Sequence, residues 1–555
     1  MTDVWGYADL HCHPMSHLGF GGAGIAPTGR RLFWGLPDPP APVEQPAAVS
    51  LPCCSAAHGV FSNPNLLPYF IEGHHGCGSP TYKDWPRYDT ITHQQMYYEF
   101  MLRAHASGLR LICALAVHNR MLATLFGYAE GTDLRDSTAI RAQVAGMKAF
   151  ADRHSTWVEV VTTPDAARAA IAQNKLAVVM GVEVDSLGDF RSESNCTDDQ
   201  VDALVDELWA MGVRTSTPIH LANNAFGGCS IGADQFNLLN HFLGEGDGKH
   251  EFFRIREGGG TDGVKNLLDT DPARKLLLTA YMHLIRSHPD PNVEMDYPAY
   301  RSIRADGHRN VRGLTARGRR LVQRMMRRGM MVDVDHMSDA SRDEVLDLAE
   351  SRDYPVYSSH TTMRELGLDQ SASTKAMKGV ASEGALTRRA LERIRDLGGV
   401  VAPITRQGPT KRFDPKIPTT PRTLDRDTSL SFSHAYLYAL DVMGHDRVAL
   451  GTDMNGFNQQ PGPRLAGGRW TGPLRPVVYD AELEVQHQQV LKKYHLGNRT
   501  FDVNVDGLAH YGLLPDFLRD VANLMGAEDR LVPLYRSAQR FIEMWERCEA
   551  RSLIP

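Results

Sequence analysis

The sequence predicts an α/β protein, a (β/α)8 barrel of the TIM type with large insertions in its strand-to-helix loops. Three observations support this fold class. Short, almost continuously apolar runs recur along the chain, and most of them are followed by a segment with helical spacing. The composition, with 42% apolar and 23% charged residues, is that of a globular protein. Apolar runs of this kind are typical of parallel strands that are buried on both faces.

Eight apolar runs are expected to form the strands of the barrel. Segments with helical spacing lie between them, among them Asp136–Arg153, Thr197–Met211 and Leu386–Leu397. In Ala316–Arg328 the apolar residues share one stripe and arginines fill the other face, as in an amphipathic helix. In chain order, the expected strands are Val4–Leu10, Leu109–Val117, Leu176–Val184, Gly212–Ile219, Gly329–Asp335, Tyr354–Ser359, Gly399–Ile404 and Arg447–Thr452.

The excess length over a plain barrel falls in loops that follow strands. Residues 14–86, after the first strand, are rich in Gly and Pro, and residues 225–310, after the fourth, contain a helical stretch near Leu276–Ile285. A shorter loop, Gln407–Arg426, follows the seventh strand. We therefore expect residues 1–555 to form a single barrel unit with two insertions and a helical C-terminal segment over 484–555. Length alone would have suggested three or four domains.

Charge and targeting signals limit the partners of the chain. The formal net charge is −6, which argues against nucleic acid and anionic membranes as partners. The start, MTDVWGYADLHCHP, lacks the basic and apolar regions of a signal peptide, and no run approaches the ~18 apolar residues of a membrane span. The eight cysteines do not suggest a disulfide framework. We expect a cytoplasmic protein with a small-molecule substrate and no nucleic-acid or membrane partner, and leave homo-oligomerisation open.

Chemically active side chains stand at the carboxyl ends of the predicted strands. The first strand runs into Asp9-Leu10-His11-Cys12-His13, where His11 and His13 point to the same side because strand residues alternate. The third strand ends at Glu183, whose carboxylate is costly to bury unless it is paired or binds a metal ion. The other candidates follow the fifth, sixth and eighth strands: His336, His360 and Asp453.

A parallel barrel brings these six side chains together, because the carboxyl ends of all its strands meet on one face. Imidazole nitrogens and carboxylate oxygens are common ligands of zinc. The alternative is that each histidine is hydrogen-bonded in the core and each acid caps the following helix. That alternative fits any one position better than all six, so the set predicts a metal site.

The run GLTARGRRLVQRMMRRGMMVDVDHMSD, from Gly313 to Asp339, is the most specific of several segments that resemble the membrane (renal) dipeptidase family, peptidase family M19 of the amidohydrolase superfamily. PVYSSHT, VEVVTTPDAARAAIAQNKLAVVMGVEV, MGVRTSTPIHLANNAFG and RVALGTDMNGF resemble four further segments of that family, in the same order, over residues 9–457. The resemblance implies an α/β barrel that binds two divalent cations, usually zinc.

The resemblance also implies a ligand set for these two ions. His11 and His13 would hold the first metal, and His336 and His360 the second. Glu183 would bridge both ions. Two cations about 3.5–4 Å apart lower the pKa of a shared water and polarise a carbonyl group, so the expected reaction is hydrolysis of an amide, in a peptide or an N-acyl compound, by a bridging hydroxide.

Two further residues receive catalytic roles by the same resemblance. Asp453 would take the proton from the bridging water and pass it to the leaving amine, and His220 would stabilise the oxyanion. His220 stands beside Asn223 and Asn224, which together make a plausible cluster of donors toward the substrate. The alternative for His220 is a hydrogen bond within its own loop.

The chain departs from the family pattern at several positions. The first strand carries His-x-His where the dipeptidases usually have His-x-Asp, and Asp335 replaces a serine. Glu183 is followed by Val-Asp instead of glycines. The arginine that grips the dipeptide carboxylate in the family falls here on Ser371, so Arg364 and Arg406 are candidate substitutes, with surface placement as the alternative. These departures leave metal chemistry intact but leave dipeptide specificity open.

Other readings follow from the same residues. An ester or lactone hydrolase or a mononuclear deaminase would use a similar site, and a non-catalytic metal-binding barrel is a third alternative.

In the first insertion, Cys53, Cys54, His58, His74, His75 and Cys77 have a spacing that matches no closed zinc site, so we expect ordinary loop residues there. His118-Asn119 contacts substrate or merely ends a strand. The arginines of residues 317–328 are expected on a solvated outer face.

Overall fold

The fold is described from a computed structural model of the chain. It describes residues 3–20, 32–54, 76–126, 133–231, 234–243, 251–259, 306–367, 383–408, 410–417, 427–464, 476–483 and 489–553. The expected helix near Leu276–Ile285 lies outside these residues.

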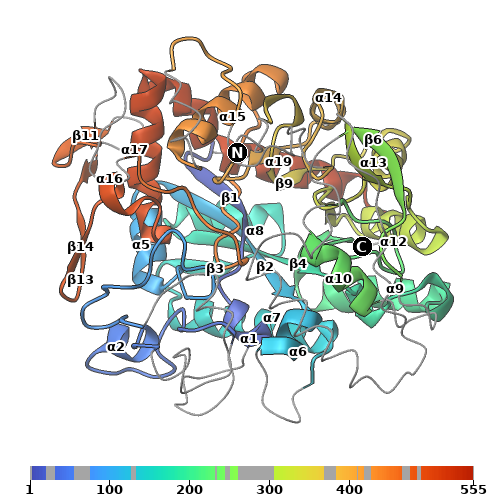
Figure 1. The fold of residues 1–555 in the computed structure, drawn as a ribbon, viewed down its shortest axis with the longest axis horizontal. Helices are drawn as coiled ribbons and strands as arrows, with labels where there is room; N and C mark the ends of the chain where they lie inside the picture. The colour runs from blue at the N-terminus through green and yellow to red at the C-terminus, as the bar shows by residue number, and fades with distance from the viewer. Residues whose placement is uncertain are drawn as a thin grey trace.

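A parallel sheet of mostly apolar strands forms the centre of the molecule (Figure 1). Five of its strands are hydrogen-bonded in the order β1-β2-β4-β5-β8, and a sixth, β3, pairs with the start of β4. Almost every residue of the three longest strands is buried, as expected for strands with both faces covered. Their bounds are β1 Tyr7–Cys12, β2 Leu109–His118, β3 Val158–Val160, β4 Leu176–Val184, β5 Val213–Thr217 and β8 Met331–Val332.

Two further parallel strands, β9 (Ser358–Thr361) and β10 (Val401–Pro403), pair with each other. A parallel bridge between Asp333 and Tyr357 connects the β8 segment to the β9 segment. The predicted eighth strand, Arg447–Thr452, is not a continuous strand but makes parallel bridges to both sides, from Val448 to Val401 and from Leu450 to Asp9. The prediction of parallel α/β architecture is confirmed.

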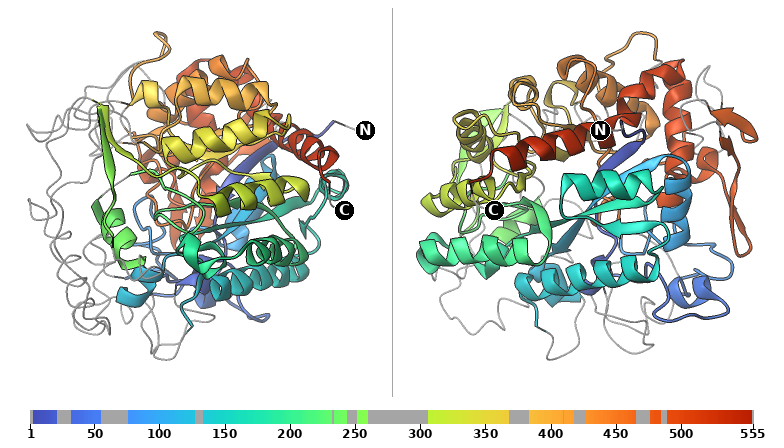
Figure 2. Two further views of the ribbon diagram at one scale, coloured as in Figure 1. Left: turned by 90° about the vertical axis from the view of Figure 1, so that its right-hand side faces the viewer. Right: turned by 180° about the vertical axis from the view of Figure 1, so that it is seen from behind.

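Helices follow the strands and lie on their outer side (Figure 2). Most of them begin at a Ser or Thr whose side chain accepts a hydrogen bond from the first turn, and Thr197 forms a complete capping box with Gln200. The principal helices are α5 Tyr98–Ala106, α7 Asp136–Arg153, α8 Pro164–Ala172, α9 Asp198–Ala210, α12 Ala316–Arg327, α13 Asp339–Glu350, α14 Arg388–Asp396 and α15 Ser429–Val442. The unit β3–α8 was not predicted from the sequence.

The arginines of α12 face acidic residues of α9. Arg320 binds Asp202 through two hydrogen bonds of 2.9 Å, and both Arg324 and Arg328 bind Asp206. Asp198, Asp202 and Asp206, spaced four residues apart on α9, thus meet Arg320, Arg324 and Arg328, which have the same spacing along α12 and its C-cap, because residues four apart share a helix face. This charged face is therefore used to pack one helix beside another.

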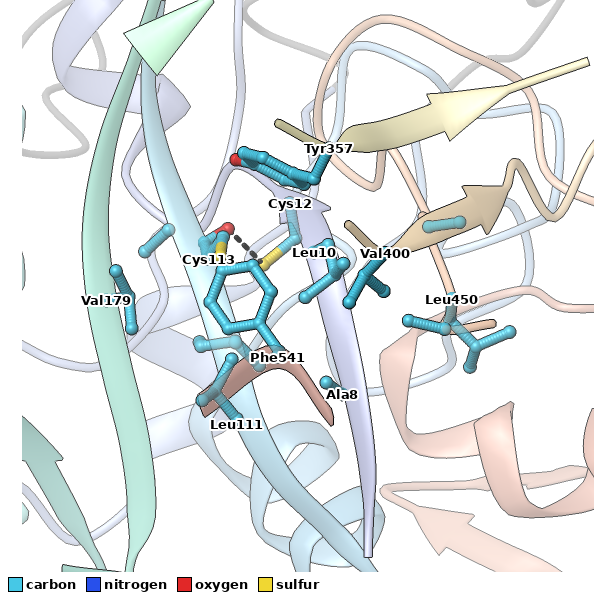
Figure 3. Packing of buried hydrophobic residues seen from close by; sticks show 14 of the residues in the cluster. Ala8, Leu10, Cys12, Leu111, Cys113, Val179, Tyr357, Val400, Leu450 and Phe541 are labelled. Atoms are coloured by element: carbon cyan, nitrogen blue, oxygen red, sulfur yellow. Dashed lines mark hydrogen bonds between the residues drawn. The ribbon is translucent and has the colours of Figure 1, made fainter. Parts of the chain in front are cut away.

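The C-terminal helix α19 (Ser537–Ala550) covers the amino ends of the strands. Seen from behind, it crosses in front of β1 (Figure 2). Ser537 accepts a hydrogen bond from the backbone of Ala8 at 2.8 Å, and Phe541 lies with Leu10, Leu111 and Val179 in the core (Figure 3). In the same core the Cys12 thiol donates to the carbonyl of Cys113 at 3.5 Å. The core is thus closed at the end opposite the polar strand ends.

The second insertion and the C-terminal segment differ in part from what the sequence predicts. The second insertion contains α10 (Asp234–Leu243) and an antiparallel hairpin of β6 (Ile255–Gly259) and β7 (Asp306–Asn310). The C-terminal segment was expected to be helical, but it begins with antiparallel pairs, β11 (Ala481–Leu483) with β12 (Gln489–Leu491) and β13 (Tyr494–Leu496) with β14 (Arg499–Phe501). Helical structure follows, including α17 (Leu514–Met525). Among the described residues, no helix is both long and apolar enough to cross a membrane.

Candidate active site

The polar strand ends converge, as the sequence analysis predicted. The predicted residues form three overlapping groups, and within each group the ligand atoms lie within 4.8 Å of one another. Each group takes its residues from at least two of the parallel segments, which explains how residues far apart in sequence meet. The groups are His11, His13 and Asp453; His11, Glu183 and His360; and Glu183, His220 and His336.

Glu183 lies at the centre of this arrangement. Its Oε2 is 3.0 Å from His11 Nε2 and 3.4 Å from His13 Nε2, and its Oε1 is 3.2 Å from His336 Nε2. His360 Nε2 lies 2.8 Å from His336 Nε2. The two oxygens of one carboxylate thus face two different groups of histidines, which is the geometry required of a bridging ligand.

The histidine rings are held by their other nitrogen. His11 Nδ1 lies 2.7 Å from Ser359 Oγ, and His13 Nδ1 donates to the carbonyl of Leu115 at 3.0 Å. His360 Nδ1 lies 3.3 Å from Asp335 Oδ2. Such contacts fix ring orientation and tautomer, so that the Nε2 lone pairs point into the centre of the site.

Burial and mutual contact shift the pKa values of these groups. Burial, partly offset by Glu183, lowers the pKa of His11 to about 4, so its imidazole is neutral at pH 7. Burial would raise the pKa of Glu183, but His11 and His220 hold it well below its usual range. Burial would likewise raise the pKa of Asp453, but its contact with His13 lowers it. A neutral His11 and ionised carboxylates are the protonation states that bind metal. Burial would lower the pKa of His360, but its contact with Asp335 raises it to about 10, so His360 must give up a proton before its Nε2 can bind a metal ion.

The donor set fits divalent metal ions. His13 Nε2 and Glu183 Oε1 are buried and make no hydrogen bond. The facing Nε2 atoms of His336 and His360 leave at least one lone pair directed into the site. Nitrogen and carboxylate ligands at these positions satisfy a zinc-type cation, whereas without a cation buried polar atoms stay unpaired.

Asp453 is a partly exposed residue of the site. Its Oδ1 lies 3.3 Å from His13 Nε2 and 3.8 Å from His11 Nε2, with 15% of its side chain exposed. Asp453 and His336 both have left-handed backbone angles, with φ of 50° and 61°. Non-glycine residues in this conformation are held by their surroundings and are common at functional sites. Gly456 is necessary beside them, because a Cβ there would lie 1.8 Å from Asp453 Oδ1.

The predicted substrate-binding residues are largely engaged in holding loops. Asn224 is buried and donates to the carbonyls of Asp185 and Pro218, while Asn223 accepts from the backbone of Cys229. Arg364 binds both oxygens of Asp339, and Arg406 binds Asp427. Their contact with a substrate stays a prediction.

Two residues next to the site were noted in the sequence only as departures from a pattern. Asp335 Oδ2 accepts a hydrogen bond from the backbone N–H of His360 at 2.7 Å, and it also faces Nδ1 of the His360 ring. Burial would raise the pKa of Asp335, but its bond to His360 lowers it to about 2. Asp185 lies 3.0 Å from His220 Nδ1. The signal for Asp185 was its position as the first residue after the strand that carries Glu183.

Among the described residues, the other clusters considered from the sequence supply no member of these ligand groups. His118 Nδ1 is 2.5 Å from Asp136 Oδ1, so this nitrogen pairs within the protein. Cys54 of the first insertion lies with its sulfur 3.2 Å from Nε2 of His93, which follows that insertion. His58, His74 and His75 lie outside the described residues.

Comparisons with known proteins agree with this site. The sequence model of the membrane dipeptidases (peptidase family M19) matches residues 298–463, which contain His336, His360 and Asp453. The protein is thus a metal-dependent hydrolase of the dipeptidase type. The predicted resemblance is confirmed, and the matched residues belong to the membrane dipeptidase family. No curated protein matches the chain.

Solved structures with some similarity include dipeptidase AC, a metallopeptidase of family M19, at 16% identity over 80% of this chain and 88% of that one, with a TM-score of 0.42. An amidohydrolase from Pseudomonas aeruginosa is 15% identical over 81% of this chain and 93% of its own, with a TM-score of 0.40. A metallopeptidase from Rhodobacter sphaeroides, solved with a phosphinate mimic of L-Ala-D-Ala, is 17% identical over 65% and 78%, with a TM-score of 0.36.

Proposed function

We propose that the protein hydrolyses an amide bond, in a peptide-like or N-acyl small molecule, with two zinc ions held at the polar strand ends. The observation that carries this proposal is the position of Glu183, whose two oxygens face His11 and His336. A mononuclear deaminase binds one metal ion, so it would leave the carboxylate of Glu183, between two groups of histidines, without a role. Metal-bridging in ester and lactone hydrolases often uses a carboxylated lysine, and neither β4 nor β5 ends in one.

The residues divide into two metal-binding groups in this proposal. His11 and His13 would hold one ion, His336 and His360 the other, and Glu183 would contact both. When bound, the two ions supply Lewis acidity that lowers the pKa of a shared water and polarises the scissile carbonyl. The ring nitrogens tied to Ser359, Leu115 and Asp335 keep these ligands oriented.

Asp453 is the proton carrier in the proposal. Its carboxylate is ionised and partly exposed, so it can accept a proton from the attacking water. The leaving nitrogen then needs that proton, and the same carboxyl group can donate it. His220, whose Nε2 lies 3.8 Å from Glu183 Oε2, would stabilise the negative charge that develops on the former carbonyl oxygen.

We also propose that eight parallel segments form a closed (β/α)8 barrel in one structural unit. The support comes from the bridges that join Asp333 to Tyr357, Val401 to Val448 and Leu450 to Asp9, which supplement the hydrogen-bonded strands. The insertions over 14–86 and 225–310 are then loops on the carboxyl side of β1 and β5. A cytoplasmic location remains a prediction.

The test is metal analysis combined with a substrate panel. The purified protein should contain about two zinc-like ions per chain, and chelation should abolish a hydrolytic activity that zinc restores. Dipeptides and N-acyl amino acids should be cleaved, whereas lactones and aminopurines should not. A single bound ion, or turnover of lactones or aminopurines alone, contradicts the proposal.

A further inference from the structure

We infer that Asp185 is a positioning residue that orients the imidazole of His220 in the site, an inference that rests on the proposed function. Both side chains are buried. His220 Nδ1 lies 3.0 Å from Asp185 Oδ1, and its Nε2 points toward Glu183 Oε2 at 3.8 Å. The contact on one ring nitrogen therefore determines where the other nitrogen points.

Asp185 holds the loop of His220 as well as its ring. Its Oδ1 also accepts the backbone N–H of Leu221 at 3.1 Å. Its backbone carbonyl accepts from Asn224 Nδ2 at 3.3 Å. One residue thus fixes the side chain at position 220, the peptide that follows it and the turn that contains Asn224.

The position of Asp185 is set in turn by helix α7. Asp136, the first residue of α7, accepts the backbone N–H of Ser186 at 2.6 Å. The other oxygen of Asp136 faces His118 Nδ1, at the end of β2, at 2.5 Å. Neighbouring strands and a helix terminus therefore hold the chain immediately after Asp185.

One strand end supplies both groups. β4 ends at Val184, so Glu183 lies on the strand and Asp185 is the first residue after it. Glu183 faces the histidines of the site directly, and Asp185 acts through His220. Within the part of the chain that the structure describes, Asp185 forms no hydrogen bond or ion pair with a predicted metal ligand, so its effect on turnover is expected to pass through His220.

Kinetics of zinc-loaded variants test this role. Asp185→Asn keeps the shape of the side chain and should lower kcat by about 10–100-fold with KM little changed, the usual effect of losing a group that orients a functional histidine. If Asp185 acts only through His220, Asp185→Asn should lower kcat no further once His220 is replaced by Asn. The double variant should therefore be no slower than His220→Asn alone. Asp189→Asn is the matched control, because Asp189 follows in the same turn and binds Ser137 instead of His220. Wild-type kcat in Asp185→Asn, or multiplying losses in the double variant, overturns the inference.

Crystal structures of the zinc-loaded wild type and Asp185→Asn give a readout that needs no activity. The His220 ring should be rotated or disordered in the variant while the metal ligands stay in place. An unchanged ring overturns the inference even where the enzyme is active. Failure of the wild type to hydrolyse any amide of the panel contradicts the proposed function instead, and the ring orientation still decides the role of Asp185.

Discussion

Glu183 faces His11 Nε2 at 3.0 Å with one carboxylate oxygen and His336 Nε2 at 3.2 Å with the other. A carboxylate placed in this way links two groups of metal ligands. Glu183→Gln should therefore reduce the metal content at both positions, because an amide is a neutral and weaker ligand. Metal analysis after dialysis should show well under two ions per chain. Glu159→Gln, on the half-exposed strand β3, is the control and should bind as the wild type does. Full metal retention by Glu183→Gln contradicts its bridging role.

Asp453→Asn should separate metal binding from catalysis. The histidines and Glu183 remain in this variant, so metal content should stay near that of the wild type. Loss of a general acid–base group should lower kcat by about 10²–10⁴-fold. The exposed Asp441→Asn on α15 should leave kcat unchanged. Retained turnover in Asp453→Asn would rule out its part in proton transfer.

Gly456→Ala should disturb the same carboxylate without removing it. The new methyl group would lie 1.8 Å from Asp453 Oδ1 and 2.8 Å from His13 Cδ2, so Asp453 must move. A displacement of about 1 Å at a reacting group can cost on the order of 10²-fold in kcat. Gly462→Ala, six residues later, meets only the edge of the Tyr88 ring at 3.2 Å and should have a much smaller effect. Equal kcat values for the two variants would show that Asp453 tolerates the displacement.

Acid should destabilise the protein partly through His93. Burial lowers the pKa of this histidine to about 3 in the folded state, against an ordinary value of 6.5. Below pH 6.5, His93 becomes protonated in the unfolded chain but stays neutral in the folded protein. This one group therefore lowers the free energy of unfolding by about 1.4 kcal/mol for each pH unit between 6.5 and 3, and contributes nothing to the slope above pH 6.5.

His93→Gln should make that acid-side loss shallower. Urea unfolding at pH 7, 6, 5 and 4 measures the slope, with His495→Gln, an exposed residue of β13, as the control substitution. Parallel curves for His93→Gln and the wild type would mean that His93 becomes protonated without unfolding.

The ion pairs between α9 and α12 should contribute modestly to stability. Burial would raise the pKa of Asp206, but Arg328 and Arg324 lower it, so the stabilisation is present at neutral pH and is lost as the pH falls below 4. Asp206→Asn should cost about 0.5–1 kcal/mol at neutral pH, because the pairs are partly solvated. The cost should shrink in 1 M salt. Asp152→Asn, at an exposed position of α7, is the control. A cost that does not change with salt would attribute the effect to packing.

Much of the site could be predicted from the sequence because strand ends carry a simple signal. His11, Glu183, His336, His360 and Asp453 each follow an apolar run, and a parallel sheet brings such ends together. The helices were predicted well where apolar residues recur at helical spacing, as in α7 and α12. The tail over 489–501 was wrongly expected to be helical, because strands of three residues are too short to show a clear period.

The sequence by itself determined the order of strands and helices, the polar residues at the strand ends and the family of residues 298–463, because periodicity and short motifs are local properties. The tertiary structure alone decided which atoms face one another. It paired Glu183 with histidines from both sides, engaged Arg364 with Asp339, and placed Asp185 against His220. These are contacts between segments up to 172 residues apart, as for His11 and Glu183, and only the packed sheet sets such distances.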